Sequence, residues 1–208
     1  MPFTTEFNSK QIQILEVAES LFAEKGFDGT PIRTIAKEAK INVAMVSYYF
    51  GSKEGLLESL VLFRTKDLKA MIDALLLQNI SSKEKINKLI EIYIHQINAN
   101  KGIYRILHFE VATKKRDLDI DAFTALRKSN FNALEAIVLI GQEEGIFKKD
   151  IAIPLLTPTI LGTFFHFHMN KEYFKTLLHL DSEEAYDQYI VQDLTQHIQQ
   201  TIKALLMI

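Results

Sequence analysis

A pair of tyrosines followed by a lysine is the feature of this sequence with the clearest capacity for binding chemistry. Tyr48 and Tyr49 lie in VAMVSYYFGSKEGLL, residues 43–57, which is interrupted at Gly51 and resumes with Lys53 close behind. A tyrosine hydroxyl can donate to a phosphate, and its ring can contact a sugar or a thymine methyl group. A lysine in the first turn of a helix can meet a phosphate together with the free backbone N–H groups there. The stretch is therefore suited to contact with a nucleic acid.

A short helix over residues 43–50 is expected to present these tyrosines. At about 100° per residue, Val46 and Phe50 share one face, while Ala44 and Tyr48 point the other way. The apolar face can pack on preceding helices, and a small residue with an exposed tyrosine on the other face fits a DNA major groove. The alternative interpretation is a helical hairpin at the surface whose tyrosines are merely exposed.

Positive charge gathers beside the tyrosine pair. Between residues 31 and 53 the cations are Arg33, Lys37, Lys40 and Lys53, and the only anion is Glu38. Arg33 falls in the first turn of a predicted helix, from which it can reach a backbone phosphate or a guanine edge. The whole chain has a formal net charge of −2, so the basic patch is local.

Capping residues before apolar runs predict where helices begin. The predicted caps are Asn8 with Gln11, Thr30 followed by Pro31, Asn42, Ser52, Ser81 with Glu84, and Asp181 with Glu184. A long helix is expected over residues 53–77 and another from about Ile120 to Gly141 or Gly145. The last helix should carry one apolar stripe, made of Tyr186, Ile190, Leu194, Ile198, Ile202 and Leu205.

These patterns predict an all-α protein of about nine helices, with no alternation typical of strands. Four of the eight glycines lie in the first 55 residues, so the front of the chain is expected to hold several short helices joined by tight turns, and the rest to hold long helices. The 208-residue chain has no cysteine, no long apolar run and no signal-like N-terminus, so we expect a cytoplasmic protein without a membrane span.

Enzymatic and metal chemistry find little support in the sequence. It shows no nucleophile–base signature, no glycine-rich phosphate loop and no paired carboxylate motif, so we predict that it is not an enzyme and needs no cofactor. His166 and His168 invite a metal interpretation. Residues two apart on a helix point about 200° apart, however, so the pair cannot share an ion, and no metal site is predicted.

The front of the chain resembles the DNA-binding domain of the TetR family of transcription regulators. Residues 14–57, ILEVAESLFAEKGFDGTPIRTIAKEAKINVAMVSYYFGSKEGLL, match the family in A..LF...G of the first helix, T.IR.IA..A of the second, and V....YYF.SKE.LL of the third and fourth. The resemblance implies an all-helical fold, with a three-helix DNA-binding domain that contains a helix-turn-helix over residues 1–53. It also implies a larger helical domain over residues 54–208 that dimerises and usually binds a small effector.

The resemblance also implies individual DNA contacts. They are Thr30, Arg33, Val43, Ala44, Met45, Ser47, Tyr48, Tyr49 and Lys53, of which Thr30 and Lys53 match phosphate contacts. Two residues depart from the family pattern. Lys40 replaces a turn glycine, at a conformational cost if its φ is positive. Ser47 replaces a tyrosine found in many members, which removes one aromatic contact.

The C-terminal part is rich in aromatic residues, from which an apolar ligand pocket with a few polar anchors can be built. The candidate pocket residues are Tyr104, His108, Phe123, Phe131, Phe164, Phe165 and His168. The alternative is that these rings simply fill the core. The last helix, paired with the segment over residues 154–174, is expected to form half of a four-helix dimer bundle.

Together these features predict a homodimeric, sequence-specific DNA-binding regulator. We expect a repressor that binds a palindromic operator and is released by an unknown small apolar or aromatic effector. The runner-up is a helical interaction protein that has lost DNA binding, and an enzyme using the helical core is a more distant alternative. DNA binding should weaken steeply as salt rises, which the runner-up would not show.

Overall fold

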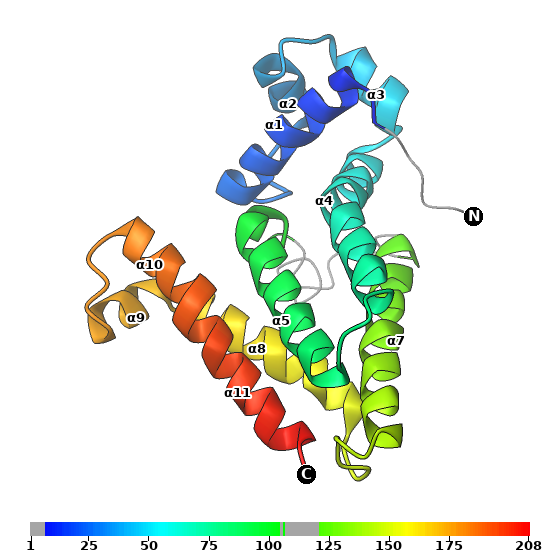
Figure 1. The fold of residues 1–208 in the computed structure, drawn as a ribbon. Helices are drawn as coiled ribbons and strands as arrows, with labels where there is room; N and C mark the ends of the chain where they lie inside the picture. Colours follow the sequence, from blue (N-terminus) through cyan, green and yellow to red (C-terminus); the bar gives the residue numbers. More distant parts are fainter. Residues whose placement is uncertain (1–6, 105, 107–120) are drawn as a thin grey trace. The chain divides into compact units, whose positions relative to one another are not determined.

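The computed structural model describes residues 7–104, 106 and 121–208, without the side chains of residues 121–123 and 126. Its α-helices are α1 (Ser9–Lys25), α2 (Ile32–Glu38), α3 (Val43–Phe50), α4 (Lys53–Leu76), α5 (Ser82–Ala99), α7 (Asp121–Glu143), α8 (Leu156–Met169), α9 (Lys171–Leu177), α10 (Glu183–Tyr189) and α11 (Thr195–Leu206) (Figure 1). A 3₁₀ turn, η1 (Ile153–Leu155), precedes α8, and a π-helical turn, η2 (Ile190–Leu194), joins α10 to α11. The all-α prediction is confirmed, with ten α-helices in the described residues where about nine were expected.

Most of the predicted helix starts are confirmed by hydrogen bonds. The Asn8 side chain accepts from the backbone N–H groups of Lys10 and Gln11, and the Gln11 side-chain oxygen in turn accepts from the backbone N–H group of Asn8. Asn42 accepts from the N–H group of Ala44 at the start of α3. The Ser52 and Ser81 hydroxyls cap α4 and α5 in the same way. Short-range sequence signals were sufficient at these four ends, because the capping side chain and the N–H group that donates to it lie within three residues of each other.

Two predicted caps are wrong. Pro31, not Thr30, occupies the cap position of α2, and no side chain caps that helix. The fully buried Thr30 hydroxyl instead donates toward the carbonyl oxygens of Gly26 (2.8 Å) and Leu21 (3.2 Å), so it fastens the loop to the end of α1. At α10 the cap is Ser182 and not Asp181, since the Ser182 hydroxyl accepts from the N–H group of Ala185.

The predicted last helix is divided by the π-helical turn η2. Its buried residues recur at every fourth position, namely Tyr186, Ile190, Leu194, Ile198, Ile202 and Leu206. A spacing of four advances about 40° per step on an α-helix, so such a stripe would drift around the helix. The wider η2 turn absorbs part of that drift. The stripe ends on Leu206 rather than on the predicted Leu205, which is 46% exposed.

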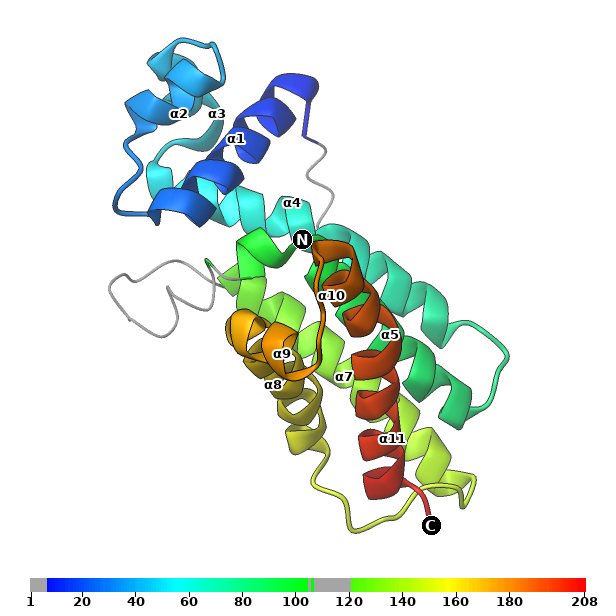
Figure 2. The same cartoon turned by 90° about the vertical axis from the view of Figure 1, so that its left-hand side faces the viewer.

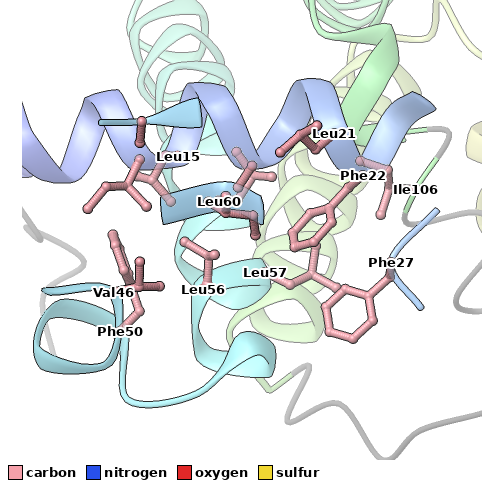
Figure 3. Close-up of a cluster of buried hydrophobic side chains, with 14 of the residues drawn as sticks. Leu15, Leu21, Phe22, Phe27, Val46, Phe50, Leu56, Leu57, Leu60 and Ile106 are labelled. Atoms are coloured by element: carbon pink, nitrogen blue, oxygen red, sulfur yellow. The ribbon is translucent and has the colours of Figure 1, made fainter. Parts of the chain in front are cut away.

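The chain forms two compact units. The first contains residues 1–67 and 99–126, and the second contains residues 68–98 and 127–208. The core of the first unit is built from α1 to α4 together with Ile103 and Ile106, which follow α5 in sequence. In Figure 3, Val46 and Phe50 lie at one end of this cluster and Phe22, Phe27 and Ile106 at the other. Helices α2 and α3 thus share a core with Ile103 and Ile106, which lie more than fifty residues further along the chain.

In the second unit, α5 buries the predicted face. Helix α8 contacts α11, and the course of both helices can be followed in Figure 2. Ile86, Leu89, Ile90 and Tyr93 are buried on α5, as their spacing predicted. The loop after α7 is clamped to the end of the chain by a single antiparallel bridge between Phe147 and Met207. None of the helices in the described residues is long and apolar enough to cross a membrane.

Candidate nucleic-acid interface

Helices α2 and α3 form a helix-turn-helix whose turn is closed by backbone bonds. The N–H group of Ile41 donates to the carbonyl of Ala36 (3.0 Å), and that of Lys40 donates to Lys37 (3.1 Å). The turn is fixed to α1 as well, because the Gln13 side-chain amide donates to the carbonyl of Ala39 (3.0 Å). The start of α3 is therefore held in a defined place on the first unit.

The faces of α3 are those predicted from the sequence. Val46 and Phe50 are buried against the preceding helices, while Tyr48 is 83% exposed. Val43, Ala44 and Ser47 are also exposed, and Met45 and Tyr49 are half-buried. The Tyr48 and Tyr49 rings meet edge to face, with centroids 5.2 Å apart. This arrangement gives α3 one packed face and one outward face of small and tyrosine side chains, which suits a DNA groove.

Cations lie on the exposed side of α2 and its turn. Arg33 and Lys37 are four residues apart, so they share a face of α2, and both are exposed. Lys40 in the turn is exposed too. Three of the four cations of the predicted basic patch are therefore exposed, and the fourth, Lys53, is half-buried.

The two predicted phosphate contacts, Thr30 and Lys53, both have partners within the protein. Thr30 is buried, and both its hydroxyl and its N–H group donate within the protein, so its side chain has no access to a phosphate. The Lys53 ammonium donates to the carbonyl of Phe27 and lies 4.3 Å from the centroid of the Phe27 ring. Neither partner was visible in the sequence, because each acceptor is a backbone carbonyl in another segment.

Lys40 adopts the left-handed conformation that the family turn requires. Its φ is +52°, which costs a residue with a side chain roughly 1–2 kcal/mol. The sequence predicted such a cost, and the structure confirms the positive φ.

Replacing Lys40 with glycine should therefore raise the free energy of unfolding by about 0.5–1 kcal/mol, because relief of strain outweighs the extra freedom of the unfolded chain. Thermal unfolding would show this as a higher midpoint. The matched control is Lys37→Gly, three residues earlier inside α2, which should lower stability by about 1 kcal/mol. A loss of stability in Lys40→Gly would contradict the assignment of strain to this turn.

The predicted ligand-pocket residues do not all fall in one unit. Tyr104 belongs to the first unit, where burial raises its pKa to about 12 and keeps it neutral. On α8 of the second unit, the buried Phe164 ring stacks on His168 (6.0 Å) and meets Phe165 edge to face (5.6 Å). Phe131 is half-buried on α7, whereas His108 and the side chain of Phe123 lie outside the described residues.

A groove that the sequence did not reveal lies on the second unit. It has a volume of about 540 Å³ and is lined by residues of α8, α9, α10, η2 and α11, among them Gly162, His166, Leu177, Tyr189 and His197. Within it, the Phe167 ring stacks on Phe174 (4.5 Å). Its lining residues come from helices that are separate in sequence, so no local sequence pattern could predict the groove. No group of three metal-binding side chains occurs among the residues that the structure describes.

Comparison with known proteins identifies the class. Residues 14–60 match the family described as bacterial regulatory proteins, tetR family, and residues 83–202 match the tetracyclin repressor-like C-terminal domain. An all-helical chain whose N-terminal part matches this DNA-binding domain is a helix-turn-helix transcription regulator. The chain belongs to the TetR family, whose members are DNA-binding regulators and not enzymes.

Individual relatives agree over most of the chain. The HTH-type transcriptional repressor NicS of Pseudomonas putida is 28% identical over 178 residues, covering 81% of this chain and 80% of that protein. The fold is similar to that of the ketosteroid regulator KstR2 of Mycobacterium tuberculosis, with a TM-score of 0.73, 19% identity and full coverage of both chains. It is also similar to FadR of Bacillus subtilis, solved with stearoyl-CoA, with a TM-score of 0.69, 20% identity and coverage of 92% and 96%.

Proposed function

We propose that this chain is a homodimeric repressor that reads a palindromic operator with α3 and leaves it when a small apolar or aromatic effector binds the helical core. The observation that carries the proposal is the division of α3 into a fully packed face and an outward face with the exposed Tyr48. A side chain exposed in this way contributes little to the packing of the protein, and contact with a DNA groove gives it a role.

The proposed reading contacts follow from exposure. Arg33 and Tyr48 project from α2 and α3, and the remaining contacts on α3 are Val43, Ala44, Met45, Ser47 and Tyr49. Base edges are read by the α3 residues, and Arg33 contacts a phosphate or a guanine. Thr30 holds the loop before α2 in place through its bond to the carbonyl of Gly26. The Lys53 ammonium donates to the carbonyl of Phe27 and, in the proposed complex, also lies near a DNA phosphate.

Dimerisation is proposed through α8 and α11. One short helix reads few base pairs, whereas two copies on a two-fold axis read two half-sites and roughly double the recognition energy. The groove lined by α8 and α11 contains an exposed glycine, Gly162. A Cβ added at Gly162 would have no other atom within 4 Å, so the space in front of it is open. A helix from a second copy can approach closely at such a position, as in a four-helix bundle.

An apolar effector is supported by the aromatic side chains of the second unit and by the relatives. Phe164 and Phe165 contribute rings on α8, where apolar surface is abundant. One similar regulator was solved with stearoyl-CoA, and another is named for ketosteroids. These ligands share a large apolar body, which is the chemistry proposed here.

Selection of bound sequences from a random DNA pool tests the proposal. The wild-type protein should enrich a palindrome, and an Arg33→Ala, Tyr48→Ala double variant should not. On the enriched operator, the logarithm of the binding constant should fall linearly with the logarithm of salt concentration, because phosphate contacts release counterions. Stearoyl-CoA added to the complex should release it if the effector class is right.

Enrichment of no sequence by a folded, dimeric wild-type protein would overturn the proposal in favour of a helical interaction protein. Release by neither stearoyl-CoA nor a steroid would remove the effector class and leave the DNA-binding role intact.

A further inference from the structure

An ion pair joins α1 to α4 inside the first unit. Both Nε and Nη2 of Arg64 lie 2.7 Å from Oε2 of Glu19, and the side chains are only 26% and 14% exposed. Two N–H groups converging on one carboxylate oxygen fix direction as well as distance. The pair links residues 45 positions apart, so it is a tertiary contact and not a local feature of one helix.

The chain that follows α5 closes over this ion pair. A Cβ placed on Gly102 would lie 3.4 Å from Oε1 of Glu19 and 3.8 Å from Cβ of Ala23. The next residues continue into the core, where Ile103 and Ile106 are buried together with side chains of α1 and α4. Three segments therefore meet at Glu19: α1, α4 through Arg64, and the chain after α5 through Gly102.

A second polar contact holds α4 to the end of α1. The Lys53 ammonium donates to the carbonyl of Phe27, in the loop that follows α1. Lys53 and Arg64 are eleven residues apart, about three helical turns, so they lie on nearly the same face of α4. Between them Leu56, Leu57 and Leu60 pack toward α1 (Figure 3). Helix α1 is thus attached to α4 at both ends of their shared apolar contact.

Helix α4 is also the element that leaves the first unit. It runs without interruption from Lys53 to Leu76, past residue 67, where the first unit ends. Because α2 and α3 pack with α1 in the core that the first half of α4 also enters, a change in the angle between α1 and α4 would move α2 and α3 together with α1. Such a movement leaves the base-reading face of α3 intact and changes only the direction in which α4 presents it.

We propose that Glu19 and Arg64, covered by Gly102, are positioning residues that set the spacing between the two half-sites the dimer recognises. Gly102, Ile103 and Ile106 act on α1 to α3 at this junction. The inference rests on the proposed dimeric, operator-reading function. A purely structural ion pair would, when broken, weaken binding equally at every half-site spacing. A positioning pair would change which spacing is preferred.

Operators with the wild-type half-sites at a graded series of separations provide the test. In Glu19→Gln the enriched half-site sequence should be unchanged, while affinity at the wild-type spacing should fall about tenfold, because α1 and α4 are no longer held at the angle that fits this spacing. The preferred spacing should broaden or shift by at least one base pair. Binding to a DNA carrying a single half-site should stay within about twofold of wild type, since the reading face is untouched.

A matched control is available on the same helix. Asp73→Asn breaks the exposed Lys69–Asp73 pair of α4 (2.7 Å), which does not reach α1, and it should leave the spacing preference as in wild type. If Glu19→Gln fails to fold, Arg64→Lys keeps the charge but not the two-pronged geometry, and it should shift the spacing in the same direction.

An engineered disulfide makes the test reversible. The 3.8 Å between Cβ of Ala23 and a Cβ at Gly102 matches the usual Cβ separation in a disulfide, and the chain has no other cysteine. In an Ala23→Cys, Gly102→Cys, Glu19→Gln variant, oxidation should restore the wild-type spacing and reduction should lose it again.

Unchanged spacing in Glu19→Gln and Arg64→Lys, with wild type still selecting a palindrome, would overturn the inference alone. Equal losses at all spacings, or a disulfide without effect on spacing, would do the same. Failure of the wild-type protein to select any palindrome would instead reject the proposed function on which the inference rests.

Discussion

Replacing Tyr48 with alanine should weaken operator binding by about 100-fold and leave thermal stability unchanged. Tyr48 is 83% exposed, and its aromatic contact within the protein is the edge of Tyr49. Removing it therefore costs the fold little. In a dimer the change occurs twice, and each lost base or phosphate contact costs about 1–3 kcal/mol, so the two together amount to about 2–6 kcal/mol, or roughly 1.5 to 4 decades of affinity.

Fluorescence anisotropy on the selected operator measures this loss, and thermal unfolding measures stability. Tyr173→Ala is the matched control, because Tyr173 is also a well-exposed tyrosine, 63% exposed, on α9 of the second unit. It should leave operator affinity unchanged. Tyr48→Phe divides the effect further, since it keeps the ring and removes the hydroxyl. Full operator affinity in Tyr48→Ala would show that α3 does not read DNA through its outward face.

Replacing Gly141 with alanine should destabilise the protein by about 2 kcal/mol, although alanine normally stabilises a helix interior by about 1 kcal/mol relative to glycine. A Cβ on Gly141 would lie only 2.2 Å from Cδ2 of the buried Phe147 ring. The ring cannot move aside easily, because the N–H group of Phe147 donates to the Gly141 carbonyl (3.0 Å) and the bridge to Met207 holds the same residue.

Chemical or thermal unfolding measures this change, expected as a fall in the midpoint of roughly 4–8 °C for a chain of this size. A double-mutant cycle supplies the control. Gly141→Ala should cost much less in a Phe147→Leu background, where a smaller side chain leaves room for the methyl group. A stabilising Gly141→Ala would mean that Phe147 does not rest on the glycine.

Sequence reasoning succeeded where the partners are close in the chain. The caps at Asn8, Asn42, Ser52 and Ser81 depend on residues within one turn, and the two faces of α3 follow from helical periodicity alone. The same reasoning misassigned Thr30, because a threonine before Pro31 looks like a cap whether its hydroxyl points along α2 or back toward α1.

What the sequence did not contain are contacts between distant segments. Nothing near Glu19 indicates that Arg64 is its partner, and nothing near Lys53 indicates that it donates to the carbonyl of Phe27. Backbone acceptors in particular leave no trace in residue type. The π-helical turn η2 was missed for a related reason, since the spacing of four that requires it reads locally as an ordinary α-helical stripe.

The burial of Ile103 and Ile106 beneath α1 and α4 limits how this regulator can be recombined with its relatives. A hybrid made by exchanging residues 1–53 would set one protein's α1 against another protein's α4 and isoleucines, and the mismatched volumes would leave holes or overlaps in a core packed like a crystal. An exchange that retains specificity has to carry residues 1–67 together with residues 99–106. The exchangeable module of this protein is thus discontinuous along the chain.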